Sequence, residues 1–490
     1  MSYSATDGPA PYSTADPTSF GYSTARTRWP IIVTGVVDDL SRAVFQHGPA
    51  KSKVEEGCAI IETLQNLKTE ILAVTQLCRL ADDGSAEITS YNEELVALGQ
   101  PTWHDSPWLF CECYLFKRIS TCFSLSEHWK DYDGFMNQKM STFKSSQPAV
   151  AELAARYKAL VSSLEKDDAA VVQAGEEIIF KEIFEICLWG NATDLSLLTN
   201  LTYEDIQKLQ GSEARKAAET NILVNDLPQV YEKLKRAQGA GTSSRVDIVL
   251  DNSGFELYVD LLLAGYLLSS GLAREVVFHP KNIPWFVSDV TPVDFEAIMG
   301  VLAHPAIFFG SSRDDSLSED LSFLSTQMES FRQEGRLSLR TSSFWTLPCG
   351  FAALPRADPE LFSELRTSQL VIFKGDLNYR KLTGDRAWDP VTPFVQAITA
   401  RAPSGKVGPQ QQQQGEGKAE KVQASSVADL NVLALRTCKA DVVVGLLSGR
   451  DEELRAATDP QYAALPTGTG GPRKWAWSGK WAVIQFSQAR

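Results

Sequence analysis

The hydrophobic pattern changes its period near residue 240, and this change limits the folds open to the chain. Upstream, apolar residues recur at spacings of three and four, as in amphipathic helices. After the small-residue connector Gly239–Ser244, short β-branched runs alternate with helical ones. The first runs are Val246–Leu250 and Glu275–Phe278, and the strongly apolar stretch Phe255–Ser270 lies between them. A strand, a helix and a strand in this order predict a parallel βαβ unit.

We therefore predict an α/β fold: a three-layer α/β/α core with a largely parallel sheet, preceded by an all-helical N-terminal domain. The expected parts are a disordered tail (1–25), a helical domain (26–240) and an α/β catalytic domain (241–490) with a disordered Gln-rich loop (402–425). The tail and the loop have little apolar surface to bury. The other expected strands are Trp285–Val287, Leu370–Phe373, Val432–Leu435, Val442–Gly445 and Trp481–Phe486.

The composition indicates which binding partners and which cellular compartment to expect. The chain has 47 basic and 61 acidic side chains, a formal net charge of −14, which repels a polyphosphate backbone. Nucleic acid is therefore not an expected partner. The eight cysteines form no CxxC pair and indicate reduced thiols. No apolar segment reaches membrane-spanning length, so we expect no membrane partner and a cytoplasmic location, with a nuclear one as the alternative.

Polar side chains follow the expected strands, where ligands bind in an open parallel sheet. The first strand ends in Asp251 and Asn252, and Glu256 lies in the first turn of the next helix. Asp289 ends a second apolar stretch. Two carboxylates and one amide suit Mg²⁺ or Mn²⁺ and leave coordination positions for water and a phosphate oxygen. Taken singly, each residue is better explained as the end of a strand or the cap of a helix, but the recurrence of such residues at several strand ends favours a site.

Two further strand ends are rich in polar groups. In the loop expected after Leu370–Phe373, Asp376 and Asn378 are placed to orient a polyol, and Arg380 and Lys381 to hold a phosphate. Arg436 and Lys439 follow a later strand where an anion would lie, although a solvated turn explains them better when they are taken alone. Other polar residues interrupt apolar helical segments and either pair internally or reach this site: Glu112, Arg118, Asn191 and Asp194.

Several familiar motifs are absent, which weighs against other chemistries. The chain lacks the GxxxxGK[ST] motif of P-loop ATPases. Aspartyl phosphatases carry a second Asp two residues after the first, but Ser253 occupies that position here. The glycine-rich turn of Rossmann methyltransferases should follow the first strand, whereas the only such glycines near it, in Gly239–Gly241, precede it. The residues themselves indicate a divalent-ion site that leaves positions for water and a phosphate oxygen.

From about Trp29 to the C-terminus the sequence resembles the metal-dependent damage-control phosphatases, formerly domain of unknown function 89. The resemblance is to the branch of the acidic-residue methyltransferase, or sugar phosphate phosphatase, proteins. It rests on a series of motifs in order: Arg28–Pro30, Gly35–Asp39, Trp108–Ile119, Asp131–Asp133, Trp189–Leu198, Asp251–Glu256, Pro284–Asp289, Lys374–Leu382 and the Arg-Thr-x-Lys signature Arg436–Lys439.

The resemblance implies a divalent ion, Mn²⁺, Ni²⁺ or Co²⁺ with Mg²⁺ as an alternative, bound by Asp251, Asn252 and Asp289. These three residues and Lys439 form the implied catalytic set. The implied substrates are small sugar phosphates such as fructose 1-phosphate and fructose 6-phosphate. Their implied contacts are Asp251, Asn252, Asp376, Leu377, Asn378, Tyr379, Arg380 and Lys439.

Three alternatives stay open. The same branch is described as S-adenosylmethionine-dependent protein-glutamate carboxyl O-methyltransferases, which implies a protein substrate and a cofactor near Glu256 and Asp289. The missing glycine turn weighs against this activity. A second alternative is a non-catalytic interaction protein that uses the helical half. Within the phosphatase hypothesis, Asp251 is either a metal ligand or a direct nucleophile.

Overall fold

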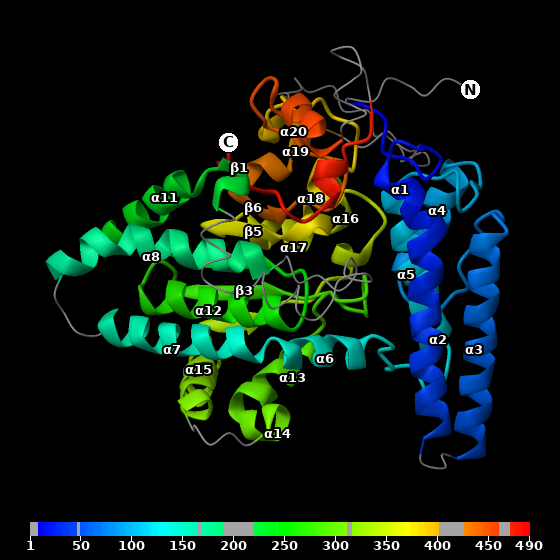
Figure 1. The fold of residues 1–490 in the computed structure, drawn as a ribbon, viewed down its shortest axis with the longest axis horizontal. Helices are drawn as coiled ribbons and strands as arrows, with labels where there is room; N and C mark the ends of the chain where they lie inside the picture. The colour runs from blue at the N-terminus through cyan, green and yellow to red at the C-terminus, as the bar shows by residue number, and fades with distance from the viewer. Residues whose placement is uncertain are drawn as a thin grey trace, which may run out of the picture.

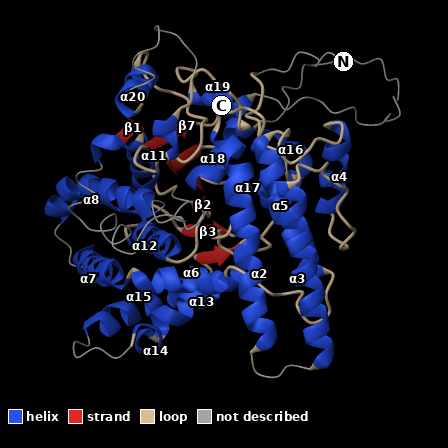
Figure 2. Ribbon diagram, turned by 45° about the vertical axis from the view of Figure 1, so that its right-hand side comes forward, coloured by secondary structure: helices blue, strands red, loops and turns tan. Residues whose placement is uncertain are grey.

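The computed structural model describes residues 8–46, 50–164, 169–190, 219–242, 244–310, 316–400, 426–459 and 471–490. In this part of the chain seven strands form one sheet of order β1-β7-β6-β5-β2-β3-β4 (Figure 2). All neighbouring strands are parallel except β6 and β7. The strands are β1 (Ile222–Asn225), β2 (Arg245–Val249), β3 (Glu275–His279), β4 (Leu337–Leu339), β5 (Leu370–Lys374), β6 (Val432–Thr437) and β7 (Ala482–Ser487).

Helices cover both faces of the sheet, because successive side chains of each strand point to opposite faces and both sets are apolar (Figure 1). In β5, Ile372 belongs to one core and Phe373 to the other. The first face carries α6 (Met136–Ser145), α7 (Gln147–Leu164), α8 (Ala169–Gly190), α11 (Leu227–Gly239), α12 (Phe255–Ser269), α13 (Pro292–Ala303), α14 (Pro305–Phe309) and α15 (Ser316–Gln333). The second carries α16 (Leu354–Ala357), α17 (Pro359–Leu365), α18 (Gly375–Thr383), α19 (Phe394–Thr399) and α20 (Arg450–Thr458). The predicted three-layer α/β/α core is confirmed.

A third core belongs to the N-terminal helices, which stand beside the layered core in Figure 1. These are α1 (Phe20–Ser23), the π-helical turn η1 (Thr24–Arg28), α2 (Trp29–Phe45), α3 (Lys51–Leu72), α4 (Glu87–Ala97) and α5 (Trp108–Ser124). The same core includes Trp285, Phe286, Leu377 and Ala440, which follow strands of the sheet. The N-terminal helices therefore pack against the carboxyl edge of the sheet.

The predicted boundary at residue 240 does not separate the helical part from the sheet. Strand β1 and helix α11 precede it, and α7 and α8 contribute to the same core as β2 and α12. The helical pattern upstream of residue 240 thus contains two groups of helices, one beside the sheet and one covering it. Among the described residues, no helix combines the length and apolar character needed to cross a membrane.

Two predicted strands are wrong. Phe286 and Val287 have φ angles of +44° and +71°, so the chain turns at Phe286–Ser288 and Trp285–Val287 is not a strand. Val442–Gly445 is buried but pairs with no strand. The short strands β1 and β4 were not predicted, because four and three residues carry little periodic signal. The predicted Gln-rich loop, and Asn191 and Asp194, lie outside the described residues.

The prediction of a disordered tail is wrong for residues 8–25. The Tyr12 amide donates to the Asp385 carbonyl at 2.9 Å, and the Thr14 amide donates to the Ser106 carbonyl at 2.9 Å. The composition of this segment is typical of disorder, but its partners are distant in sequence. Local composition therefore does not reveal them.

Asp441, which follows β6, holds the N-terminal segment in place. Its Oδ2 accepts from the Ser19 hydroxyl and the Phe20 amide at 2.9 Å, and its Oδ1 accepts from the Trp477 indole at 2.8 Å. The Phe20 ring stacks on Trp477 and meets Trp108 edge-on. One carboxylate thus joins the first helix to the last part of the chain.

Asp441→Ala should lower the free energy of unfolding in urea by about 3 kcal/mol, because three donors lose their acceptor. Burial raises the pKa of Asp441 to about 6, so the folded protein binds a proton here more tightly than the unfolded chain. The carboxyl therefore adds stability as the pH falls from 7 toward 5, and the deficit of the variant should grow over that range. Asp459→Ala, which removes a surface ion pair with Lys474, is the control and should cost less than about 1 kcal/mol. Equal losses in the two variants would contradict this role.

Candidate active site

A cavity opens at the carboxyl edge of the sheet, between the strand ends and the N-terminal helices. Together with the open solvent at its mouth, it contains about 390 Å³ of space not filled by protein atoms. Its walls combine residues that follow strands with residues from the helical part of the chain: Arg28, Trp108, Glu112, Asp251, Phe286, Asp289, Asp376, Leu377, Arg380 and Lys439. This is the position where ligands bind in open α/β sheets.

The residues after β2 and β3 bring two carboxylates to this cavity. An isolated antiparallel bridge joins Asn252 to Asp289, and the Val290 amide donates to the Asp251 carbonyl at 2.8 Å. The loops that carry Asp251 and Asp289 are therefore held side by side, as the strand-end pattern predicted. Asp251 is 3% exposed to solvent and Asp289 is 1% exposed, so both carboxylates lie in a mostly dry environment.

Asn252 lies next to the cavity and does not line it. Its Nδ2 donates to Asp251 Oδ2 at 2.8 Å and to Glu256 Oε2 at 2.7 Å. Its Oδ1 accepts from the Ser288 hydroxyl at 2.5 Å. The amide is thus tied to the residues on both sides of it.

Glu256 is fully buried and does not line the cavity, in contrast to the cofactor contact that the family resemblance implied. Its Oε1 accepts from Lys374 Nζ at 3.0 Å, and the same ammonium lies 2.7 Å from Asp260 Oδ1. Burial lowers the pKa of Lys374, but the charges of Asp260 and other nearby acidic groups, the Cys187 thiol among them, outweigh burial and raise that pKa well above its ordinary value. Lys374 therefore stays charged inside the core.

Two more buried lysines support the loop of Asp289. Lys281 Nζ lies 3.3 Å from Asp289 Oδ2 and donates to the Leu250 carbonyl at 2.7 Å. Lys139 donates to the Asp289 carbonyl at 3.2 Å and to Asp294 at 2.9 Å. These contacts offset negative charge from behind the cavity.

The segment after β5 is helix α18 and not the predicted loop, and this decides which of its side chains reach the cavity. Asp376, Leu377 and Arg380 line it, at positions one turn apart on one helix face. Asn378 Nδ2 donates to main-chain carbonyls at the end of β2, at 3.4 and 3.2 Å, and to the Lys374 carbonyl at 2.7 Å. The predicted polyol contact of Asn378 is therefore not supported.

Tyr379 and Lys381 also point away from the cavity. The Tyr379 hydroxyl donates to Gln485 at 2.8 Å within the core of the second face. Lys381 donates to the carbonyls of Trp345 and Leu347 at 3.0 and 2.6 Å. The predicted substrate contact of Tyr379 and the predicted phosphate contact of Lys381 therefore do not fit the geometry.

Arg380 is held rigidly in the cavity wall. It donates to Glu112 at 2.7 Å and to both oxygens of Asp385 at 3.1 and 2.9 Å, and its guanidinium carbon lies 3.8 Å from the centre of the Trp108 ring. Burial lowers the pKa of Arg380, but the charges of Asp385 and Glu112 outweigh burial and raise it. The side chain is thus fixed before any ligand binds.

The segment after β6 contributes Lys439 to the cavity. The Lys439 amide donates to Asp376 Oδ1 at 3.0 Å, and Arg436 donates to the same oxygen at 2.7 Å. Arg436 is fully buried, so it positions Asp376 from behind rather than meeting an anion in the cavity. Of the two cations predicted here, Lys439 alone lines the cavity.

Four of the lining residues were not predicted as site residues: Arg28, Trp108, Glu112 and Phe286. Glu112 was recognised as a polar insertion, and it does reach the site, where it also accepts from the Trp29 indole at 3.3 Å. Its neighbour Arg118 instead pairs with Glu70 at 3.0 Å. A polar residue within an apolar helical segment thus indicated that Glu112 could reach the site. The same pattern applied to Arg118, so it could not show which of the two residues lies in the cavity.

The donor set fits a small divalent cation. Asp251 and Asp289 supply hard oxygen ligands, and the amide oxygen of Asn252 lies on the side of the Asp289 loop. The backbone leaves room for the Asp251 carboxylate, because a Cβ atom at Gly375 would lie 1.9 Å from Asp251 Oδ2. Asp251 and Asp289 therefore line the cavity where they would hold such an ion, and Asn252 contacts Asp251 from beside the cavity.

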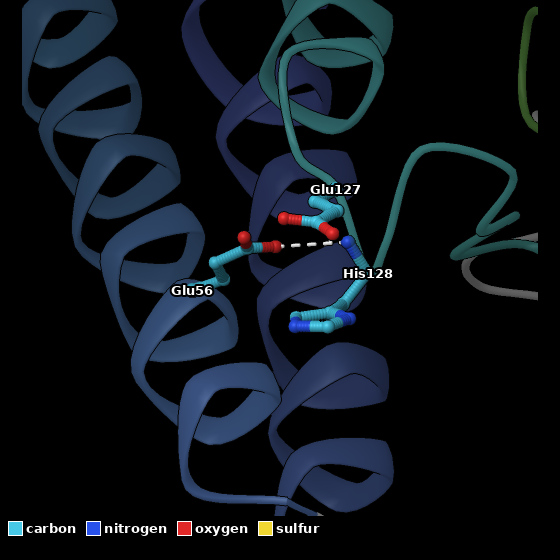
Figure 3. Close-up of side chains that lie close together, drawn as sticks. All are labelled: Glu56, Glu127 and His128. Atoms are coloured by element: carbon cyan, nitrogen blue, oxygen red, sulfur yellow. Dashed lines mark hydrogen bonds between the residues drawn. The ribbon is translucent and has the colours of Figure 1, made fainter.

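Glu56, Glu127 and His128 form another group of possible metal ligands, on the surface between α3 and the loop after α5 (Figure 3). Glu56 Oε2 already accepts from the Ser126 hydroxyl and from the His128 amide, the latter at 3.0 Å. His128 Nε2 lies 3.0 Å from the Ser52 hydroxyl. These hydrogen bonds fix the loop onto α3, and they account for the closeness of the three side chains without a bound metal ion.

The chain is similar to known proteins over most of its length. Residues 24–454 match the family model described as the damage-control phosphatase ARMT1-like domain. The chain is 34% identical to "Damage-control phosphatase ARMT1" of Danio rerio over 96% of this chain and 95% of that protein. It is 32% identical to the Homo sapiens protein of the same name, over 98% of each chain. A crystal structure of a DUF89 family protein from Pyrococcus horikoshii aligns with a TM-score of 0.36 and 14% identity, covering 74% of this chain and 87% of that one.

Gly375→Ala should displace the Asp251 carboxylate, because the new Cβ would overlap it and because φ at this position is +81°. We expect the free energy of unfolding to fall by about 1–3 kcal/mol and Mn²⁺ binding, measured by calorimetry, to weaken strongly. Gly384→Ala is the matched control: φ is +69° at the other end of α18, and the new Cβ would meet Arg386 instead. It should lose stability and keep its Mn²⁺ affinity. Equal Mn²⁺ binding by both variants would show that Asp251 is not a ligand.

Proposed function

Because the chain belongs to the damage-control phosphatase ARMT1-like family, we propose that it is a metal-dependent phosphatase of small sugar phosphates, such as fructose 1-phosphate and fructose 6-phosphate. The single observation that carries this proposal is that acidic and basic side chains line the same cavity. Asp251 and Asp289 supply carboxylates, and Arg28, Arg380 and Lys439 supply basic groups. A divalent ion and a phosphate group need these two environments next to each other.

The remaining charges of the cavity largely compensate each other. Glu112 pairs with Arg380 at 2.7 Å, and Asp376 pairs with buried Arg436 at 2.7 Å. Asp289 lies 3.3 Å from the Nζ atom of buried Lys281, and Asp251, Arg28 and Lys439 complete the charged lining of the cavity. We propose that the carboxylates bind the cation and that the two basic side chains face the phosphate.

We propose Mn²⁺, Ni²⁺ or Co²⁺ as the ion, with Mg²⁺ as an alternative, because carboxylate and amide oxygens accept all of them. A bound divalent ion supplies Lewis-acid polarisation of the phosphoryl group and lowers the pKa of a water molecule. Asp251, Asn252 and Asp289 are the residues that would hold it.

The other residues of the cavity have separate roles in this proposal. Lys439 and Arg380 offset the charge that develops on the phosphoryl oxygens, and Arg380 does so without reorganising because Glu112 and Asp385 already fix it. Asp376, fixed through Oδ1 by Arg436, accepts hydrogen bonds from sugar hydroxyls. The cavity also has an apolar wall that excludes water from the carbon skeleton of the sugar: Trp108, Phe286 and Leu377.

No contact in the described part of the chain favours methyl transfer from S-adenosylmethionine to a protein glutamate. Both oxygens of Glu256 are engaged within the core, by Lys374 and by Asn252. Methyl transfer is therefore kept as an outcome of the test.

Purified protein incubated with Mn²⁺ and a panel of sugar phosphates should release inorganic phosphate, with the highest kcat/KM for small ketose phosphates. Parallel reactions with labelled S-adenosylmethionine and an acidic protein should show no transfer of label. Chelation of the metal should stop phosphate release, and added Mn²⁺ should restore it. Labelling without any metal-stimulated phosphate release would replace this proposal with the methyltransferase.

Asp251→Asn should reduce turnover by on the order of 100-fold or more while the fold survives, because it keeps the shape of the side chain but removes one negative charge from the ion. Lys439→Ala should raise KM and lower kcat without loss of Mn²⁺ binding, because it faces the phosphate and not the ion. Calorimetry with Mn²⁺ and phosphate release measure the two effects separately. Near-normal metal affinity and turnover in Asp251→Asn would contradict the proposed site.

A further inference from the structure

A chain of buried polar groups runs from the core to Asp251. It begins at Lys374, the last residue of β5, which is fully buried and donates to Glu256 Oε1 at 3.0 Å and to Asp260 Oδ1 at 2.7 Å. The Cys187 carbonyl, at 3.1 Å, is the third acceptor of its ammonium. Glu256 and Asp260 are one helical turn apart on α12, so both face β5. Three elements of the core, α8, α12 and β5, therefore fix the lysine.

Glu256 uses its two oxygens differently. Oε1 accepts from Lys374, and Oε2 accepts from Asn252 Nδ2 at 2.7 Å. The same Nδ2 donates to Asp251 Oδ2 at 2.8 Å. Glu256 therefore connects the buried lysine with the pair of residues that we propose as metal ligands.

The orientation of the Asn252 amide depends on these neighbours. An amide has a donor end and an acceptor end, and its surroundings decide which end faces which group. Here two carboxylate oxygens require the NH₂ group on the side of Asp251 and Glu256, and the Ser288 hydroxyl donates to the oxygen on the other side at 2.5 Å. Turning the amide over would place its oxygen against two carboxylates.

We propose that Glu256 and Lys374 are positioning residues that set the orientation of the Asn252 amide and, through it, the position of the Asp251 carboxylate. The inference rests on the proposed metal site. Lys374 occupies Oε1 and so leaves Oε2 as the acceptor for Asn252. Neither residue touches the cavity, and both act on the metal ligands from within the core. Outer-shell contacts of this kind commonly control how well a site binds its metal.

Glu256→Gln changes this arrangement with almost no change in shape. The ammonium group of Lys374 can only donate hydrogen bonds, so it keeps the glutamine oxygen as its partner. The glutamine NH₂ group must then face Asn252. Asn252 turns over to accept from it, and its own oxygen meets the Asp251 carboxylate. We expect Mn²⁺ affinity, measured by calorimetry, to fall by about 10- to 100-fold, with only a small change in melting temperature.

The double variant Glu256→Gln with Lys374→Met tests whether the two residues orient the Asn252 amide or only stabilise the core. Without the ammonium, the glutamine is free to turn its oxygen toward Asn252, so the native amide orientation returns. The double variant should therefore bind Mn²⁺ more tightly than Glu256→Gln alone, even though its core has lost an ion pair and its melting temperature is lower. A purely structural role predicts that the second substitution weakens binding further.

Lys381→Met is the matched control. Lys381 is as buried as Lys374, but its partners are the carbonyls of Trp345 and Leu347. This variant should lose stability and retain its Mn²⁺ affinity. Ser288→Ala removes the donor at the other end of the Asn252 amide and provides a second test if Glu256→Gln fails to fold, with weaker Mn²⁺ binding as the expected result.

The outcomes distinguish this inference from the proposed function. If the wild-type protein binds no Mn²⁺, the proposed function and the inference that rests on it both fail. If the wild type binds Mn²⁺ and folded Glu256→Gln binds it equally well, the positioning role alone is overturned. The positioning role is also overturned if the double variant binds more weakly than Glu256→Gln, or if folded Ser288→Ala and Lys381→Met have the same affinity.

Discussion

Several carboxylates converge on one buried edge of a parallel sheet, and the rest of the structure depends on how their repulsion is offset. Most of these carboxylates have a buried cation behind them, supplied by the core and not by solvent. The pairs are Asp289 with Lys281, Glu256 with Lys374, Asp376 with Arg436 and Glu112 with Arg380. Each cation neutralises the charge of its carboxylate and fixes one of the two carboxylate oxygens.

The N-terminal helices share in this compensation, which explains why they pack where they do. Their core includes Phe286 and Leu377 from the sheet edge, and Glu112 of α5 pairs with Arg380 of α18 at 2.7 Å. The Trp108 ring covers the same guanidinium at 3.8 Å. The helical part of the chain is therefore a wall of the cavity.

The sequence predicted the sheet and the convergence of Asp251 and Asp289 well, because both follow from local pattern and from the geometry of parallel strands. It did not predict which side chains of α18 face the cavity, since Gly375 starts a helix at once and the helix turns Asn378 and Tyr379 into the core. Contacts between elements distant in sequence, such as those of Glu112, are set by tertiary packing and have no local signal. Homology rather than periodicity had suggested a cofactor contact for Glu256, whose partner Lys374 fixes it within the core.

A crystal structure of the protein with Mn²⁺ and inorganic phosphate, with anomalous scattering data collected at the manganese edge, tests the central claim most directly. The account predicts a peak within about 2.6 Å of carboxylate oxygens of both Asp251 and Asp289, with phosphate between that peak and Lys439. A peak at Glu56, Glu127 and His128 and none at the strand ends would contradict it.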